Sequence, residues 1–299
     1  MKTILLPLES GDGLQSMLET AWLAATAFGS TIQGLYIRRA LPGVVVADIG
    51  GYAAAAPDLV ESFEAEDRER GASARRAFEE FLRGKGVTLG EPPGAGPPDV
   101  RPTSPGPTGE ERPSATWAEE IPPGDAAVGM YARLFDLTVV GRPVPGASTP
   151  AASTLETVLF DSGRPILIAP PSAPKNLGGT AVVSWNASTE TARAVAFAMP
   201  FLRRAERVVV LAVEGVMVPG PSAAEAARHL QLNGVAAETR EAATSGRGGG
   251  ETILAEAAAL GADLLVKGAY THSRLRQMIF GGATSKILAE AELPVFMAH

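Results

Sequence analysis

Cysteine is absent from this chain of 299 residues, and histidine occurs only three times. Without cysteine the protein can have no disulfide bond, no thiolate nucleophile and no cysteine-ligated zinc or iron–sulfur site. The three histidines, His229, His272 and His299, lie far apart in the sequence, which argues against a histidine-rich metal site. Catalysis that depends on a thiolate or on a histidine-bound metal is therefore not expected.

The chain also lacks an excess of basic residues and any long apolar run. Its formal net charge is −7, whereas nucleic-acid-binding proteins usually carry a basic face. No apolar run approaches the length that spans a membrane. The first apolar run meets Pro7 and Glu9 too early to form the core of a signal peptide. We therefore expect a cytoplasmic protein that binds neither nucleic acid nor membranes.

Apolar strands alternate with amphipathic helices along most of the sequence, which predicts parallel sheets with helices on both faces. The length favours two domains of ordinary size. In the first half we expect strands at residues 3–8, 31–37, 115–121, 136–140 and 165–168, and helices at 14–28, 57–83, 125–133 and 153–160. In the second half we expect strands at 180–185, 207–213, 236–241, 262–267 and 294–298, and helices at 188–202, 222–233, 251–260 and 284–291. Residues 44–56 fit neither pattern.

An internal repeat relates the two halves. Residues 136–141, with the sequence DLTVVG, match residues 263–268, with the sequence DLLVKG. Residues 163–168 likewise match residues 292–297. Two copies of one five-stranded α/β unit account for both matches.

The repeat and the local composition define the domain boundaries. We expect an N-terminal domain at residues 1–169 and a C-terminal domain at 180–299, joined by a linker rich in proline and glycine at 170–179. Residues 92–113 are dense in proline and glycine and nearly free of large apolar side chains. Such a composition cannot bury apolar area, so we expect a disordered insertion there.

Residues 264–288 are the strongest candidate for a functional site. They run from a short buried strand through a polar loop to small residues at 281–285, where a helix begins. Backbone N–H groups are unpaired at the start of a helix, the helix dipole adds partial positive charge, and glycine allows close approach. This stretch therefore predicts an anion pocket. The glycine-rich residues 246–250 complete no phosphate-binding motif, and we expect a flexible turn there.

Each half resembles a universal stress protein domain, and the whole chain resembles the tandem members of that family. The family signature, G-x2-G-x9-G-[ST], lies between the fourth strand and the fourth helix. Gly268 and Gly281 match its first and last glycines, whereas Thr271 replaces the middle glycine and Gly282 stands at the hydroxyl position. The hydroxyl groups follow slightly later, at residues 284 and 285, as in a variant found in tandem members.

The resemblance implies two doubly wound five-stranded parallel sheets of strand order 3-2-1-4-5, the adenine-nucleotide alpha-hydrolase-like fold. In such a sheet a ligand lies beyond the carboxyl ends of strands 1 and 4, where the strand order reverses. The family implies ATP or ADP there, with or without Mg²⁺. It also places Asn186 where an aspartate is usual, and an amide has a different charge and acceptor pattern. The candidate nucleotide-binding residues are Trp185, Asn186, Ala187, Ser188, Gly268, Thr271, Arg274, Gly281, Gly282, Ala283, Thr284 and Ser285.

The first half departs further from the family pattern. Glu9 stands near the usual aspartate, but residues 141–150, which follow the fourth strand, contain three prolines and lack the terminal glycine. Proline has no backbone N–H to donate to a phosphate. We therefore expect that the first domain does not bind nucleotide in the manner of the family.

Three classes of function remain open. The first is nucleotide binding in the C-terminal domain with a conformational or partner-binding output, and the second is an interaction or dimerisation module whose sites are vestigial. The third is an enzyme with at most slow ATP hydrolysis, for which Lys267 and Lys286 are the nearby lysines. No catalytic constellation is recognisable, so no catalytic residue and no metal ligand is assigned. The last strand, 294–298, is expected to pair the two domains within the chain or to join a homodimer.

Overall fold

The structure is a computed structural model, and it describes residues 1–8, 13–38, 46–49, 52–55, 57–90, 112–118, 124–143, 151–269 and 282–299. Most of the expected insertion at 92–113 lies outside these residues. Glu9, the candidate residues Thr271, Arg274 and Gly281, and most of the loop after the fourth strand lie outside them as well.

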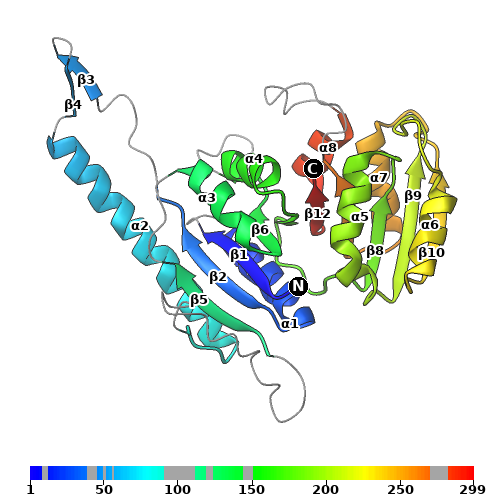
Figure 1. The fold of residues 1–299 in the computed structure, drawn as a ribbon, viewed down its shortest axis with the longest axis horizontal. Helices are drawn as coiled ribbons and strands as arrows, with labels where there is room; N and C mark the ends of the chain where they lie inside the picture. Colours follow the sequence, from blue (N-terminus) through cyan, green and yellow to red (C-terminus); the bar gives the residue numbers. More distant parts are fainter. Residues whose placement is uncertain are drawn as a thin grey trace.

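Ten strands form one sheet in which two five-stranded parallel units meet edge to edge (Figure 1). The strands of the first half are β1 (Thr3–Leu8), β2 (Thr31–Tyr36), β5 (Ser114–Ala118), β6 (Leu137–Gly141) and β7 (Ile166–Ala169). Those of the second half are β8 (Thr180–Ser184), β9 (Arg207–Val213), β10 (Ala237–Ala242), β11 (Leu264–Gly268) and β12 (Val295–Ala298). The order β10-β9-β8-β11-β12-β7-β6-β1-β2-β5 contains 3-2-1-4-5 twice, which confirms the predicted fold class.

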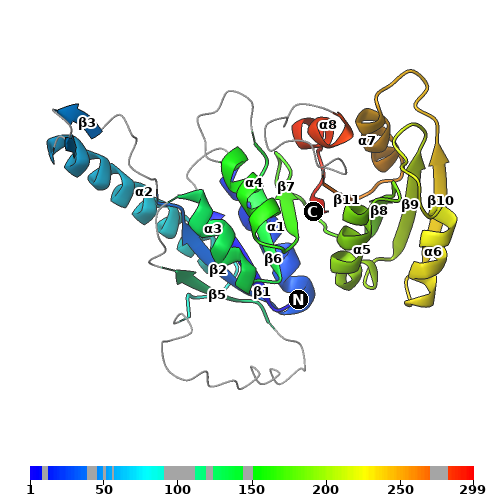
Figure 2. The ribbon, with the colours of Figure 1, turned by 45° about the horizontal axis from the view of Figure 1, so that its top comes forward.

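Helices cover both faces of the sheet (Figure 2). In the first half these are α1 (Leu14–Phe28), α2 (Pro57–Gly84), α3 (Asp125–Tyr131) with the 3-10 turn η2 (Ala132–Leu134), and α4 (Ala151–Asp161). In the second half they are α5 (Thr189–Leu202), α6 (Ala223–Leu232), α7 (Gly249–Ala259) and α8 (Gly282–Glu290). One core cluster lies under α1, α2, α5 and α6, and the other lies under α3, α4, α7 and α8. None of the described helices is long and apolar enough to cross a membrane.

Side chains alternate between these two clusters along each buried strand. In β11, Leu264 and Val266 belong to the first cluster and Leu265 to the second. This is the period of two that a strand covered on both faces requires. It places the next residue, Lys267, on the same face as Leu265.

The repeated aspartate has the same structural role in both halves. Asp136 accepts hydrogen bonds from the backbone nitrogens of Lys2, at 2.6 Å, and Thr3, at 3.1 Å. Its counterpart Asp263 accepts them from Gly179, just before β8, and from Thr180, the first residue of β8, at 3.1 and 3.0 Å. Each carboxylate thus fixes the start of the first strand of its half against the fourth.

The two halves are joined by an antiparallel pairing of β7 with β12, and Val295 lies opposite Ile168. Because β12 also pairs with β11, both edges of the last strand are used within the chain. The sequence left two partners open for the last strand, the other domain of the same chain or a second chain. In the structure β12 pairs with the other domain of the same chain. Around the junction the rings of Phe28 and Phe201 meet edge to face with centroids 4.8 Å apart.

Two segments differ from the sequence prediction. Residues 44–56, which were unassigned, contain an antiparallel hairpin of β3 (Val46–Ile49) and β4 (Tyr52–Ala55). The expected flexible turn at 246–250 is partly wrong, because α7 already begins at Gly249. A methyl group on Gly250 would lie 2.7 Å from the carbonyl oxygen of Ala283, so this glycine is needed for α7 to pack on α8.

Candidate functional site

The strand order of the second half reverses between β8 and β11. These two strands are parallel neighbours, with Ser184 opposite Lys267, and β9 and β12 flank them on either side. The chain leaves β8 through residues 185–188 and leaves β11 through Gly268. The crevice beyond a reversal of this kind is the usual ligand position in an open α/β sheet.

Residues 185–188 form a tight loop that is held by its own polar groups. The side-chain oxygen of Asn186 accepts hydrogen bonds from the backbone of Ser188, at 3.2 Å, and from the hydroxyl of Thr191, at 2.5 Å. Ala187 has a φ of 67°, a left-handed conformation that is uncommon for alanine. The Asn186 oxygen thus supports the loop, and the strained Ala187 is of the kind that concentrates at functional sites.

Helix α5 begins beside this loop. The hydroxyl of Ser188 caps it by accepting a hydrogen bond from the backbone of Thr191 at 3.2 Å. Glu190 lies in its first turn. Burial alone raises the pKa of Glu190, but hydrogen bonds from its own backbone, Thr189 and Ser188, together with the charge of His299, hold that pKa below its usual value. A carboxylate is therefore present at the edge of the crevice.

Trp185 lies on the face of the sheet covered by α5 and α6. It is 8% exposed, and its indole nitrogen donates a hydrogen bond to the carbonyl oxygen of Pro221 at 2.9 Å. Its ring packs in the core cluster under those helices and lines a cleft between them. The structure thus separates the ring of Trp185 from the other candidate residues.

Gly268 lies directly against the start of α5. A methyl group at this position would overlap the backbone nitrogen of Thr191 and would lie 2.6 Å from the carbonyl carbon of Glu190. Only glycine allows β11 and α5 to approach this closely. The first glycine of the predicted motif therefore has a packing role whether or not a ligand binds.

The side chain of Lys267 is buried beneath α8. Its ammonium donates hydrogen bonds to the carbonyl oxygen of Gly268 and to the hydroxyl of Thr284, both at 2.8 Å. Both partners are neutral oxygens, and burial lowers the pKa of Lys267 to about 8. The sequence marked Lys267 only as a nearby lysine, although its place at the end of an apolar strand and just before a glycine was a usable signal.

The start of α8 lies over this lysine. Gly282 has a φ of 84°, a left-handed conformation suited to glycine. Thr284 is 7% exposed and turns its hydroxyl toward Lys267, while Ala283 and Ser285 are half-buried. The crevice thus combines a buried cation, a hydroxyl and the first turn of a helix on one side with the Glu190 carboxylate on the other. Among the described residues no group of histidines and carboxylates is placed to hold a metal ion.

The comparisons with known proteins fit this geometry. Residues 180–299 match the model of the universal stress protein family. These residues form a universal stress protein domain. A universal stress protein from Archaeoglobus fulgidus DSM 4304 aligns with 99% of this chain and 95% of its own, at 16% identity and a TM-score of 0.69. A putative universal stress protein from Pseudomonas aeruginosa UCBPP-PA14 aligns with 100% and 93%, at 14% identity and a TM-score of 0.52. No curated protein matches the sequence.

The family model covers the second half alone, whereas the two solved structures extend the fold of universal stress proteins over the whole chain. The described part of the loop after β6 differs from its counterpart after β11. Arg142 in this loop donates a hydrogen bond to the carbonyl oxygen of Ala291, at 2.7 Å, in the other half. In the universal stress protein domain the corresponding strand ends at Gly268, against the start of its own α5.

Proposed function

We propose that the universal stress protein domain at residues 180–299 binds an adenine nucleotide, ATP or ADP, beyond β8 and β11. Bound nucleotide would then change the conformation of the protein or its affinity for a partner, as part of a stress response in the cytoplasm. The observation that carries the proposal is the buried ammonium of Lys267 beside the hydroxyl of Thr284, at 2.8 Å. A buried cation whose partners are neutral oxygens is costly, and a phosphate group would supply the missing negative charge.

The first turn of α8 adds further donors on the same side. Backbone N–H groups at a helix start bind phosphate well, and residues 282–285 provide them together with two hydroxyl groups. Thr271 and Arg274 are assigned to the phosphates, and residues 186–188 to the base and sugar, on the basis of the family pattern alone. Mg²⁺ would enter with the nucleotide, bound mainly by its phosphates.

A second function, an interaction module without nucleotide, is favoured by one feature of the crevice. The Glu190 carboxylate would repel a phosphate. The side-chain oxygen of Asn186 already accepts two hydrogen bonds within its own loop, which leaves it less able to bind a base. In this alternative the chain would act through its surfaces, with a second copy or with another protein. Nothing in either function requires turnover beyond slow ATP hydrolysis.

Titration calorimetry of the full chain with ATP and ADP, with and without Mg²⁺, separates the two functions. The matched variants are Lys267→Met, which removes the buried charge, and Lys286→Met, which removes a half-buried lysine paired with Glu290. We expect binding by the wild type, about tenfold or more weaker binding by Lys267→Met, and no change for Lys286→Met. Absence of binding up to about millimolar nucleotide would refute the proposal and leave the interaction module.

A further inference from the structure

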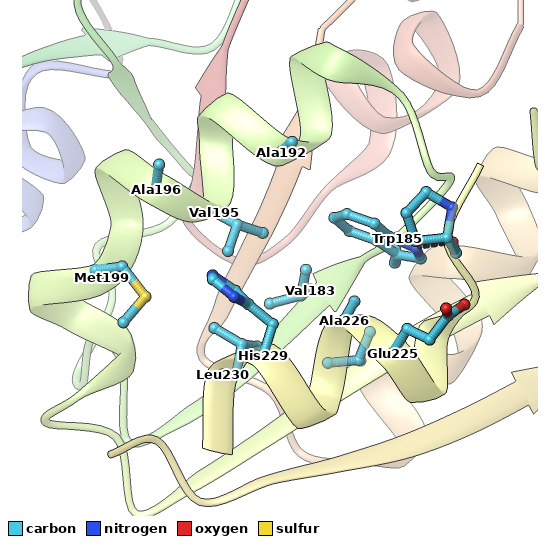
Figure 3. Close-up of a pocket in the computed structure, with 12 residues that line it drawn as sticks. Val183, Trp185, Ala192, Val195, Ala196, Met199, Glu225, Ala226, His229 and Leu230 are labelled. Carbon is cyan, nitrogen blue, oxygen red and sulfur yellow. Dashed lines mark hydrogen bonds between the residues drawn. The ribbon is translucent and has the colours of Figure 1, made fainter. Parts of the chain in front are cut away.

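A cleft of about 410 Å³ opens between α5 and α6, on the face of the sheet away from Lys267 (Figure 3). Val183 of β8 and Val210 of β9 belong to the core cluster under α5 and α6 and line the floor of the cleft. The ring of Trp185 lies at one end. This volume is within the range of pockets that hold small organic ligands. The cleft does not include the crevice proposed for nucleotide.

Small side chains create the cleft. Helix α5 contributes Ala192 and Ala196, one turn apart, and α6 contributes Ala226. The indole of Trp185 cannot swing in to fill the space, because its nitrogen is held by the carbonyl oxygen of Pro221. The cleft is therefore open in the structure without any movement of Trp185.

In the first half of the chain an aromatic ring fills the region that corresponds to this cleft. The strand registers place Gly34 of β2 at the position that Val210 holds in β9. In the first half the ring of Phe78 from α2 lies directly on Gly34, fully buried, with the ring of Trp117 6.0 Å away. Helix α6 carries no phenylalanine, tyrosine or tryptophan. An aromatic ring is thus part of the core in one repeat and is not supplied by the covering helix in the other.

The mouth of the cleft carries a negative charge. Glu225 and His229 lie one turn apart on α6, both exposed, and no lysine or arginine is among the lining residues. Hydrogen bonds from Ser222 lower the pKa of Glu225, so its carboxylate stays ionised. A cationic group is therefore favoured at the mouth over an anionic one.

We propose that the cleft between α5 and α6 binds a small aromatic amine, with its ring against Val210 and Trp185 and its ammonium at Glu225. The floor and walls supply apolar contact for a ring, and Trp185 adds an aromatic partner. Glu225 supplies the counter-charge from the exposed part of the lining. This binding is independent of the proposed nucleotide site.

The test uses the full chain with three probes of similar size, 2-naphthylmethylamine, 2-naphthoate and decahydronaphthalen-2-ylmethylamine. Titration calorimetry is expected to show binding of the naphthyl amine and about tenfold weaker binding of the other two. Glu225→Gln keeps an acceptor for the cap at Ser222 but removes the charge, so it should weaken the amine about fivefold and leave the carboxylate probe unchanged or stronger. Equal affinity for amine and carboxylate in the wild type would overturn the proposal.

The location is tested with two phenylalanine variants on the same helix. Ala226→Phe puts a ring into the cleft and should abolish binding, whereas Ala224→Phe adds the same ring at an exposed position outside it and should leave binding intact. Circular dichroism of both variants checks that the fold is retained, and Glu225→Gln still tests the site if Ala226→Phe fails to fold. Equal loss in both variants, or a concentration-dependent dimer that Ala226→Phe dissociates, would overturn the proposal, the latter by showing that a second copy covers the cleft.

Discussion

Gly268 and Thr191 lie so close together that there is no room for a β-carbon on Gly268. The methyl group would overlap the Thr191 nitrogen and approach its hydroxyl oxygen to 2.7 Å. That hydroxyl donates to Asn186, so the glycine, the threonine and the loop after β8 form one packed unit. The glycine that the family pattern marks for a ligand is thus also a requirement of the fold.

Replacing Gly268 by alanine should therefore destabilise the protein strongly. The added carbon meets backbone atoms that cannot move aside, and overpacking of this kind costs about 1–3 kcal/mol, here at the upper end. Gly84→Ala is the control, because nothing lies within 4 Å of the added carbon there. Urea unfolding should show a large loss of unfolding free energy for Gly268→Ala and no loss for Gly84→Ala. A Gly268→Ala protein as stable as wild type would contradict the packing role.

Lys267 should make stability depend on pH in the alkaline range. Its pKa falls from 10.5 in the unfolded chain to about 8 in the folded protein. Between these values the unfolded chain binds a proton that the folded protein has lost, so the free energy of unfolding rises as the pH increases. Below pH 8 both states are protonated, and the full cost of burying the charge, about 3 kcal/mol, is present.

Lys267→Met should consequently be more stable than the wild type at pH 7. The gain is expected to be about 1–3 kcal/mol, because two hydrogen bonds to Gly268 and Thr284 are lost with the charge. Urea unfolding at pH 7 and pH 10 measures it, and the advantage should shrink at the higher pH. A variant that is less stable at pH 7 by an amount that does not change with pH would show that the hydrogen bonds outweigh the burial cost.

The same lysine shows how far the sequence predicts the site. Periodicity predicted α1 and β1 with their observed bounds, since Gly29 ends the helix in a left-handed conformation and each element has a clear apolar pattern. The contact of Lys267 with Thr284 spans 17 residues and depends on how α8 lies over β11. Local pattern carries no information on such a contact.

Glycine was the residue type that local reasoning interpreted least well. Gly249 and Gly250 looked like a flexible turn, yet both lie in α7. Their small size matters because Val216 and Ala283 come close from other segments, which only the tertiary structure reveals. The reversal of strand order beyond β8 and β11 was predictable, because it follows from the repeat and the family topology rather than from any single residue.

Asp136 and Asp263 should contribute equally to the stability of the protein. Replacing either by alanine removes the acceptor for two backbone N–H groups at the start of a strand, at an expected cost of about 1–3 kcal/mol. Thermal unfolding of the single variants at pH 7 should show losses of similar size. Markedly unequal losses would mean that the repeated residue does not have equivalent roles.

Acid should reduce the effect of replacing Asp136. Burial raises the pKa of Asp136, but hydrogen bonds from Lys2 and Thr3 and the charge of the amino terminus lower it further, to below its usual value. A carboxylate of this kind stabilises the fold above its ordinary pKa, and its contribution is lost as the pH falls through the folded value. The difference between wild type and Asp136→Asn should thus narrow below pH 4. If the difference in stability does not change with pH, the charge of Asp136 does not contribute and the shape of the side chain accounts for the effect.

Phe28 and Phe201 couple the two halves of the chain. Their rings meet edge to face at 4.8 Å, and Phe201 also contacts Phe296 of β12 at 5.8 Å. A double-mutant cycle with Phe28→Ala and Phe201→Ala should give a coupling free energy of about 0.5–1.5 kcal/mol. Phe201→Ala alone should cost about 3–5 kcal/mol because that ring is fully buried, and Phe28→Ala should cost less. Urea unfolding followed by fluorescence and by circular dichroism measures the cycle. Since β7 and β12 share one sheet, we expect a single unfolding transition in the wild type. If the losses of unfolding free energy in the two single variants add up to the loss in the double variant, the contact between the two rings does not link the halves.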